Sequence, residues 1–286
     1  MYVSKIYDVL EEATEILKHK PLLRRVKGTA IVSGDLHGDY DALKQLKKIR
    51  KKNKAKNLVL LGDFVDRGDK QLEVIFEIAK LVIKDKNFFP LRGNHEDENI
   101  CTINRYQRNG FEHVIKSEHL DLDPFLDFFA QLPIAAVSNN SFMCHGGLPV
   151  NDINIDKIDN YSRVKSMKIQ NQVVNSNMYQ FLWNDPLDDQ KIQKMHSFPS
   201  PRDPGNAFWF GEPVTYKFLE KNDLKFLLRA HEVFSQGAKW MQNDRILSLF
   251  TSNSGHYAKK NINRKCAFID LSDKNIERKD ITLLGV

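Results

Sequence analysis

Short apolar runs, each ending in a polar loop, recur along the chain. Five such runs are TAIVS, NLVLL, NFFPL, SFMC and LKFLL, and the loops that follow them are GDLHGDY, GDFVDRGD, RGNHED, HGG and RAHE. Apolar and β-branched runs of this length, closed by polar and mostly glycine-bearing segments, are typical of buried strands that lead into tight loops. We therefore predict five strands, each with a polar loop at its carboxyl end.

Apolar residues at helical spacing fill several of the intervals between these strands. They predict an N-terminal helix over about residues 4–20, helices over 39–50 and 70–83, and a mainly helical stretch at 97–132. Alternation of strand, helix and strand predicts an α/β fold with parallel pairing in the first third of the chain.

The second half of the sequence has a different pattern. After residue 210 the runs LKFLLR, RILSLFTS and KCAFIDL follow one another without long helices between them, which predicts a sheet completed by antiparallel strands. Residues 151–210 are rich in Asn, Asp, Pro and Ser and are too long for an inert loop, so we expect helices and a functional loop there. Because no low-complexity linker divides the sequence, we expect one domain over residues 1–286, with its core at about 27–275.

Composition narrows the class of protein. Hydrophobic residues make up 41% and charged residues 28%, which is ordinary for a globular protein with a sizeable core. The three cysteines are widely spaced and form no CxxC pair, so we predict no disulfide framework and expect a reducing, cytoplasmic environment. The first 20 residues contain acidic side chains and no apolar core, so we expect no signal peptide there. No run approaches the roughly 18 apolar residues of a membrane span, so we expect no transmembrane helix.

The loops at the strand ends carry a set of possible metal ligands. If the strands share an open α/β sheet, loops at their carboxyl ends face one crevice. Taken singly, Asp63 could be a helix N-cap and Asn94 a turn residue, but five such loops in one chain argue against coincidence. The polar residues at these strand ends are Asp35, His37, Asp63, Asp66, Arg67, Arg92, Asn94, His95, His145 and His231. Oxygen and imidazole ligands without thiolate suit Mn, Fe or Zn, and two aspartates, one asparagine and three histidines are too many for one ion but suit two that share a carboxylate.

The motifs GDLHGD, GDFVDRG, LRGNHE, HGG and RAHE, in this order, resemble those of the calcineurin-like metallophosphoesterase superfamily. More narrowly, they resemble the PPP family of protein serine/threonine phosphatases, over roughly residues 20–270, and the compact chain resembles archaeal or bacterial members. The resemblance implies a sandwich of two mixed β-sheets flanked by helices, with the site at the carboxyl ends of the strands. It also implies hydrolysis of phosphoserine and phosphothreonine in proteins by direct attack of a hydroxide held between two divalent metal ions.

The resemblance assigns the ligands to two metals, of which manganese is the one we expect to support activity in vitro, with iron and zinc as alternatives. Asp63 would bridge the two ions. One ion would be held by Asp35, His37 and Asp63, and the other by Asp63, Asn94, His145 and His231.

Further residues receive roles in catalysis from the same resemblance. His95 would protonate the leaving alkoxide, and Asp66 would hydrogen-bond His95 and orient it. Arg67 and Arg202 would bind the phosphoryl oxygens, and Tyr257 would lie near the substrate.

Two parts of the sequence depart from the family pattern. The segment PSPRDPGNAFWFG differs around Arg202, and FTSNSGHYAKKN is about a residue longer, which leaves His256 as an alternative to Tyr257. We expect Arg92 and Arg229 to support loops rather than to bind substrate.

Two other functions are compatible with parts of the sequence. A phosphoesterase for dinucleoside polyphosphates or nucleic acid would need to recognise bases, and relatives of that kind more often have GNHD where this chain has GNHE. A non-enzymatic protein could bind nucleic acid through the lysine-rich residues 44–56, in a chain of net charge +6, but this would leave the ligand set unexplained. We therefore expect phosphoproteins as partners and neither membrane nor nucleic acid, and the sequence names no regulatory protein.

Overall fold

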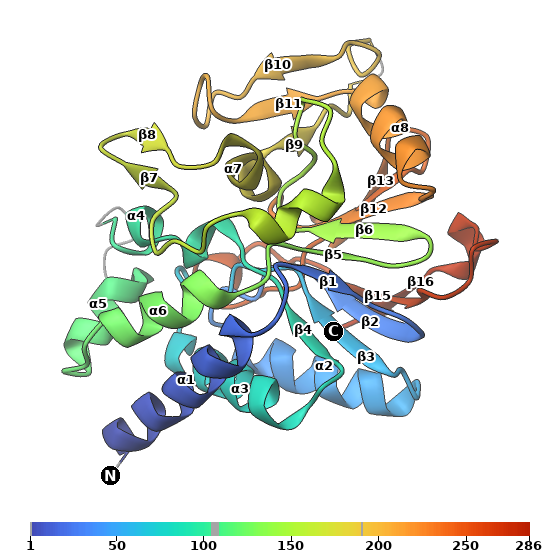
Figure 1. The fold of residues 1–286 in the computed structure, drawn as a ribbon. Coiled ribbons are helices and arrows are strands. Elements are labelled where there is room, and N and C mark those ends of the chain that lie inside the picture. The colour runs from blue at the N-terminus through green and yellow to red at the C-terminus, as the bar shows by residue number, and fades with distance from the viewer. Residues whose placement is uncertain (1, 104–108, 190) are drawn as a thin grey trace.

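Two β-sheets pack face to face at the centre of the molecule, and helices cover the outer face of each (Figure 1). The computed structural model describes residues 2–103, 109–189 and 191–286, with side chains from residue 5 onward. The predicted sandwich of two mixed sheets with flanking helices is confirmed.

The first sheet has the strand order β16-β15-β2-β3-β4. β2, β3 and β4 are parallel to one another, as predicted for the first third of the chain, and β15 pairs antiparallel with both β2 and β16. The strands are β2 (Thr29–Ser33), β3 (Asn57–Leu60), β4 (Phe88–Pro90), β15 (Lys265–Asp270) and β16 (Thr282–Gly285).

The second sheet has the order β1-β5-β6-β12-β14-β13. β12 is parallel to both β6 and β14, whereas β5 and β13 are antiparallel to their neighbours β6 and β14. The strands are β1 (Leu23–Arg25), β5 (Ala135–Val137), β6 (Ser141–Cys144), β12 (Phe226–Arg229), β13 (Ala238–Met241) and β14 (Ile246–Leu249).

The prediction for the strands after residue 210 was therefore wrong in part. β12 and β14 lie in one sheet and pair in parallel, while β15 lies in the other sheet. From β12 the chain first forms the edge strand β13. It then turns back antiparallel to β13 and enters the sheet between β12 and β13 as β14.

Strands of this kind are apolar throughout because both of their faces are buried. In β3, Leu58 and Leu60 pack against the helices, while Val59 and the adjacent Leu61 pack between the two sheets. The polar residues of each strand segment are consequently concentrated where the strand ends.

Helices over the first sheet agree closely with the predicted segments. α1, α2, α3 and α6 correspond to the helices predicted over 4–20, 39–50, 70–83 and 97–132, and the last of these stretches also contains α4, α5 and the undescribed residues 104–108. Their bounds are α1 (Tyr2–Lys18), α2 (Tyr40–Lys52), α3 (Gln71–Lys84), α4 (Glu98–Cys101), α5 (Phe111–Ser117) and α6 (Asp123–Gln131). No helix in the described part of the chain is long and apolar enough to cross a bilayer.

The region 151–210 contains the expected helices and also short strands, and it packs against the second sheet. A short hairpin lies beside α4, and a helix and a small three-stranded sheet lie on the same side of the second sheet as α8 (Figure 1). Their elements are η3 (Ile155–Asn160), β7 (Lys168–Ile169), β8 (Gln172–Val173), α7 (Ser176–Trp183), β9 (Asp185–Pro186), β10 (Ser197–Pro199) and β11 (Phe208–Phe210), followed by α8 (Glu212–Lys221).

Candidate active site

The predicted metal ligands converge from the carboxyl ends of strands in both sheets. All six are buried. The first sheet supplies Asp35 and His37 after β2, Asp63 after β3 and Asn94 after β4, and the second supplies His145 after β6 and His231 after β12. Two facing sheets, rather than the one shared sheet that the residues alone suggested, thus form the crevice.

The backbone at this crevice is held in an uncommon conformation. His37, Asp63, Asp66, Arg67 and His231 all have positive φ, between 42° and 70°. Such left-handed residues other than glycine are infrequent and cluster at functional sites, where the surrounding structure holds them.

Close approach of two loops requires glycine. A Cβ on Gly93 would stand 2.3 Å from the backbone nitrogen of Asp63, and one on Gly62 would stand 2.4 Å from the nitrogen of Gly93. Glycine at both positions therefore lets the loops that carry Asp63 and Asn94 lie against each other.

One group of donor atoms surrounds His37. His37 Nε2 lies 3.5 Å from Asp35 Oδ2 and 3.5 Å from Asp63 Oδ2. His37 Nδ1 donates to the carbonyl of Val65 at 2.7 Å, so the Nε2 lone pair faces the two carboxylates. His95 belongs to the same cluster, with its Nε2 3.9 Å from Asp63 Oδ2.

A second group surrounds His145 on the other side of Asp63. His145 Nε2 lies 2.9 Å from Asn94 Oδ1, 3.2 Å from His231 Nδ1 and 3.3 Å from Asp63 Oδ1. His145 Nδ1 donates to the carbonyl of Leu61 at 2.8 Å, so Nε2 presents a lone pair to these acceptor atoms.

These donors fit divalent cations. Acceptor atoms that face one another without a shared proton repel, and a cation between them removes that repulsion. Ligands about 2.0–2.2 Å from a tetrahedral ion lie about 3.3–3.6 Å from one another, close to most of the separations found around His37 and His145. The donor set contains nitrogen and oxygen without sulfur, which suits Mn, Fe or Zn.

The pKa shifts within the cluster also indicate a site that favours a cation. Burial alone would raise the pKa of Asp63, but His145, His95 and His37 together hold that pKa well below its usual value. Burial would likewise lower the pKa of His145, but Asp63 and Asp35 outweigh it and raise that pKa. The carboxylates therefore create a negative potential that favours a positive charge at this point.

His95 and Asp66 form a hydrogen-bonded pair beside the first group. His95 Nδ1 lies 2.6 Å from Asp66 Oδ2, and the other oxygen of Asp66 accepts from the backbone nitrogen of Phe111 at 2.8 Å. Asp66 is thus fixed on both sides and sets the orientation of the imidazole. Burial lowers the pKa of His95, with Asp63 and Asp66 opposing that shift.

Arg67 lies next to this pair. Its Nη2 is 3.1 Å from His95 Nε2, and its Nη1 donates to the hydroxyl of Tyr257. Tyr257 is only 1% exposed and lines neither of the two cavities described below, so its contact with Arg67 is the route by which it could influence a bound phosphate. His256, the alternative to Tyr257, lines the larger cavity.

Arg202 and Arg229 have different surroundings. Arg202 is 41% exposed and its Nε lies 3.2 Å from Asp185 Oδ2. Arg229 is fully buried and donates to Asp185 Oδ1 at 2.7 Å and to Glu232 at 2.7 Å. Arg202 therefore faces the site, whereas Arg229 supports the loop, as expected.

Arg92 also has the supporting role that we expected. It is buried and donates to the carbonyls of Glu96, Val164 and Lys165 at 3.0, 2.6 and 2.9 Å. It thereby ties the loop that carries Asn94 and His95 to the region after α6.

Two residues that support the site were not identified from the sequence. Glu96 accepts hydrogen bonds from the backbone nitrogens of Asp63, Gly93 and Phe64 at 2.7–2.8 Å, and burial followed by the charge of Asp63 raises its pKa to about 7. Asp185 joins Arg202 to Arg229. The last residue of the GNHE motif could have indicated Glu96, whereas no sequence pattern indicated Asp185.

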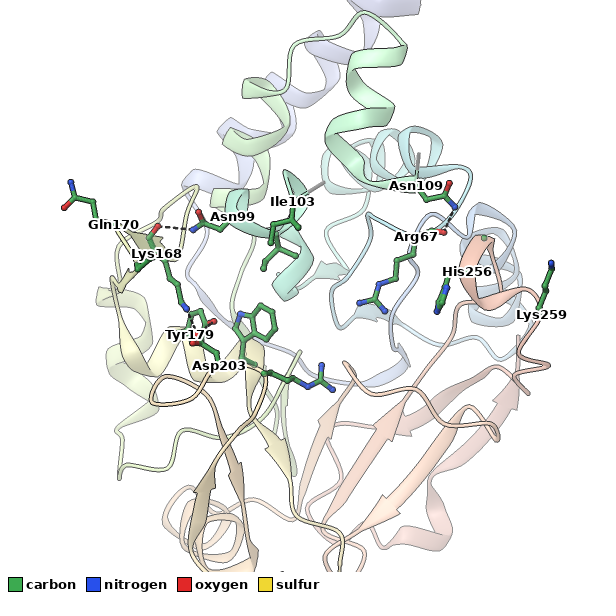
Figure 2. Close-up of a pocket in the computed structure, with 15 residues that line it drawn as sticks. Arg67, Asn99, Ile103, Asn109, Lys168, Gln170, Tyr179, Asp203, His256 and Lys259 are labelled. Carbon is green, nitrogen blue, oxygen red and sulfur yellow. Dashed lines mark hydrogen bonds and ion pairs between the residues drawn. The ribbon is translucent and has the colours of Figure 1, made fainter. Parts of the chain in front are cut away.

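Two connected cavities lie over these residues. The smaller, of about 340 Å³, is lined by both donor groups, including His37, Asp63, Asn94 and His231. The larger, of about 1460 Å³, is lined by the side chains drawn in Figure 2. Arg67, Trp183 and Arg202 line both, so the two arginines lie where the cavities meet.

The chain is similar to known proteins in both sequence and structure. The sequence model of a family described as calcineurin-like phosphoesterase matches residues 28–234. A protein serine/threonine phosphatase from Saccharomyces cerevisiae with similarity to human phosphatase PP5 has a similar structure, with a TM-score of 0.82 and 22% identity over 98% of this chain and 88% of that one. A cold-active protein-tyrosine phosphatase of a psychrophilic Shewanella species has a TM-score of 0.61 and 14% identity over 90% of this chain and 79% of that one. At these identities the two structures show a shared fold.

Proposed function

The chain belongs to the calcineurin-like phosphoesterase family, and we propose that this phosphoesterase removes phosphate from phosphoserine and phosphothreonine in proteins. The observation that carries the proposal is the position of Asp63 between two donor groups, at the floor of a cavity whose mouth holds two arginines. Divalent ions bound there would supply a nucleophile from water at neutral pH and positive charge beside the phosphoryl oxygens.

The residues divide between two ions around Asp63. Asp35, His37 and Asp63 would hold one, and Asp63 with Asn94, His145 and His231 would hold the other. We expect manganese to support activity in vitro, with iron or zinc as alternatives. The hydrogen bonds from His37 to Val65 and from His145 to Leu61 support these assignments because they direct both Nε2 lone pairs into the site.

Arg67 and Arg202 would bind the phosphoryl oxygens of the substrate. Both line the junction of the two cavities, and a guanidinium can donate two parallel hydrogen bonds to phosphate. Tyr257 would keep Arg67 in position through their hydrogen bond.

His95 would deliver a proton to the leaving alkoxide. Asp66 holds its Nδ1, which leaves Nε2 directed toward the site. In this structure Arg67 approaches Nε2, and a phosphate that draws the guanidinium toward itself would allow Nε2 to carry a proton instead. A serine or threonine alkoxide is a poor leaving group, so this proton would contribute about 10²–10⁴ to the rate.

Two features favour a protein over a nucleotide as substrate. The motif ends in Glu96 rather than the aspartate more often found in relatives that act on dinucleoside polyphosphates. The larger cavity is open and lined by polar side chains such as Asn99, Asn109 and Lys168, and it exceeds the about 300–1,000 Å³ usual for small-molecule sites.

Phosphate release tests the proposal. The purified protein with added manganese should hydrolyse phosphoserine and phosphothreonine peptides, EDTA should abolish the activity, and manganese should restore it. An Asp63→Asn variant, which removes the charge shared by both donor groups, should be inactive and should bind less metal. Turnover only of a dinucleoside polyphosphate or only of phosphotyrosine would overturn the proposed substrate class.

A further inference from the structure

The larger cavity has room for much more than one phosphorylated residue. Its volume of about 1460 Å³ leaves space for substrate residues that flank the phosphorylated one. Figure 2 shows two walls facing each other across it. Lys168, Tyr179 and Asp203 lie on one wall, and Arg67, His256 and Lys259 lie on the other.

The cations near the first wall are already neutralised. Lys168 forms an ion pair with Asp203, whose other hydrogen-bond donors include the hydroxyl of Tyr179. Arg202, at the inner end of the cavity, is paired with Asp185. An anion arriving on this side would have to compete with carboxylates that are in place.

The lysines on the opposite side of the cavity are not paired in this way within the described residues. Within the described part of the chain, neither Lys259 nor Lys260 forms an ion pair, and Asp203 is the only acidic residue that lines the cavity. Lys260 lies over the ring of Tyr257, 5.1 Å from its centre. Partial burial, followed by the charges of Lys260, Arg67 and His37, lowers the pKa of His256, so this histidine contributes a hydrogen-bonding group and the lysines contribute the charge.

The segment 255–260, which carries these two lysines, is hydrogen-bonded to Arg67, the arginine that would bind phosphate. The backbone nitrogen of His256 donates to the carbonyl of Arg67 at 3.1 Å, and the side chain of Arg67 donates to Tyr257. A Cβ on Gly255 would stand 2.0 Å from the carbonyl oxygen of Arg67, so only glycine allows this approach. Lys259, two residues beyond Tyr257, is therefore held on the same side of the cavity as Arg67.

We propose that Lys259, with His256 beside it, forms a subsite for a second anionic group of the substrate. The enzyme would then prefer phosphoproteins in which a carboxylate or a further phosphate lies close in sequence to the residue that loses its phosphate. This inference rests on the proposed function, since it concerns how the same site selects among phosphoproteins. Charge complementarity across an open cavity acts on binding, so the preference should appear in KM rather than in kcat.

Three phosphoserine peptides of equal length test the subsite. One carries glutamines around the phosphoserine, one carries glutamates at the same positions, and one carries a second phosphoserine. We expect kcat/KM to be about fivefold higher for an anionic peptide than for the glutamine peptide at low salt, the size expected of one exposed ion pair, and the difference to shrink at 1 M salt. Comparison of the two anionic peptides shows whether carboxylate or phosphate is preferred.

Variants of Lys259 test whether this subsite causes the preference for anionic peptides. Lys259→Gln should reduce the ratio of anionic to neutral kcat/KM to about one, and Lys259→Glu should reverse it. Lys52→Gln, which removes an exposed charge at the distant end of α2, should keep the wild-type ratio.

Failure of this inference differs from failure of the proposed function. Hydrolysis of all three peptides with equal kcat/KM, or a preference that survives Lys259→Glu, would overturn the subsite and leave the phosphatase activity standing. Hydrolysis of none of the peptides would overturn the proposed function itself.

Discussion

Replacement of Glu96 by alanine should destabilise the protein by several kcal/mol, although Glu96 is expected to touch neither metal nor substrate. Its carboxylate accepts from the backbone nitrogens of Asp63, Gly93 and Phe64, all of them in the buried loops of the site. Each buried donor left without an acceptor costs about 1–3 kcal/mol. Three such donors give at least about 3 kcal/mol, a large part of the about 5–15 kcal/mol that stabilises a typical protein.

A graded pair of variants sharpens this prediction. In Glu96→Gln the amide oxygen can replace the carboxylate oxygen that accepts from Asp63 and Gly93, and the amide nitrogen then opposes the nitrogen of Phe64. Phe64 loses its acceptor, as does Val65 in its longer hydrogen bond of 3.4 Å, whereas Asp63 and Gly93 keep theirs, so we expect a loss of about 1–3 kcal/mol, between wild type and Glu96→Ala. Activity should fall in the same order, because Asp63 is held by the loop that Glu96 closes.

Urea unfolding followed by circular dichroism measures the free energy of unfolding of each variant. Glu98→Ala is the matched control, because the side chain of Glu98 accepts no hydrogen bond within the described residues, and it should cost less than about 1 kcal/mol. The reasoning is refuted if Glu96→Ala is no less stable than Glu98→Ala, or if Glu96→Gln and Glu96→Ala unfold at the same urea concentration as wild type.

Two further predictions concern the polar residues around the metal cluster. His95→Asn should keep both metals and lower kcat on a phosphoserine peptide by about 10²–10⁴, with a smaller loss on p-nitrophenyl phosphate, whose leaving group needs little protonation. Loss of one metal on analysis of this variant would instead make His95 a ligand, which its place in the donor group beside His37 allows. Arg202→Ala should lower kcat/KM at least about tenfold with little change in stability, whereas Arg229→Ala should cost about 3–5 kcal/mol because it leaves the carboxylate of Asp185 buried without its main partner. Equal effects of the two arginine variants on unfolding and on kcat/KM would contradict this division of roles.

The parts of the fold that sequence could predict are those with local causes. The helices α2 and α3 have apolar residues at helical spacing, and the parallel strands between them follow from the alternation of strand and helix. The strand ends were visible because apolar runs stop at glycine and aspartate. The convergence of their side chains was expected because loops at the carboxyl ends of strands face one crevice, although two sheets rather than one form it.

Sheet membership of the later strands was not predictable in the same way. β14 and β15 follow each other with one 3-10 turn between them but belong to different sheets, because the chain crosses from one to the other through residues 250–264. Both strands are apolar on two buried faces, and such a strand carries no sign of which sheet it joins. The parallel pairing of β12 with β14 also has no local signal, since β13 rather than a helix connects them.

The supporting contacts of the site were hidden for a related reason. Asp185 pairs with Arg229 across 44 positions, and Glu96 reaches backbone nitrogens more than 30 positions away. Backbone donors have no sequence signature, so only the folded arrangement reveals which carboxylate they need. The candidate metal ligands and catalytic residues could therefore be identified from the sequence, whereas the residues that hold them in position could not.

The central claim is that Asp63 joins two metal ions, and anomalous diffraction from crystals grown with manganese tests it most directly. We predict two anomalous peaks about 3.5–4 Å apart, both in contact with Asp63, one next to His37 and the other next to His145. A single peak, or peaks at which Asp63 contributes no ligand, would contradict it.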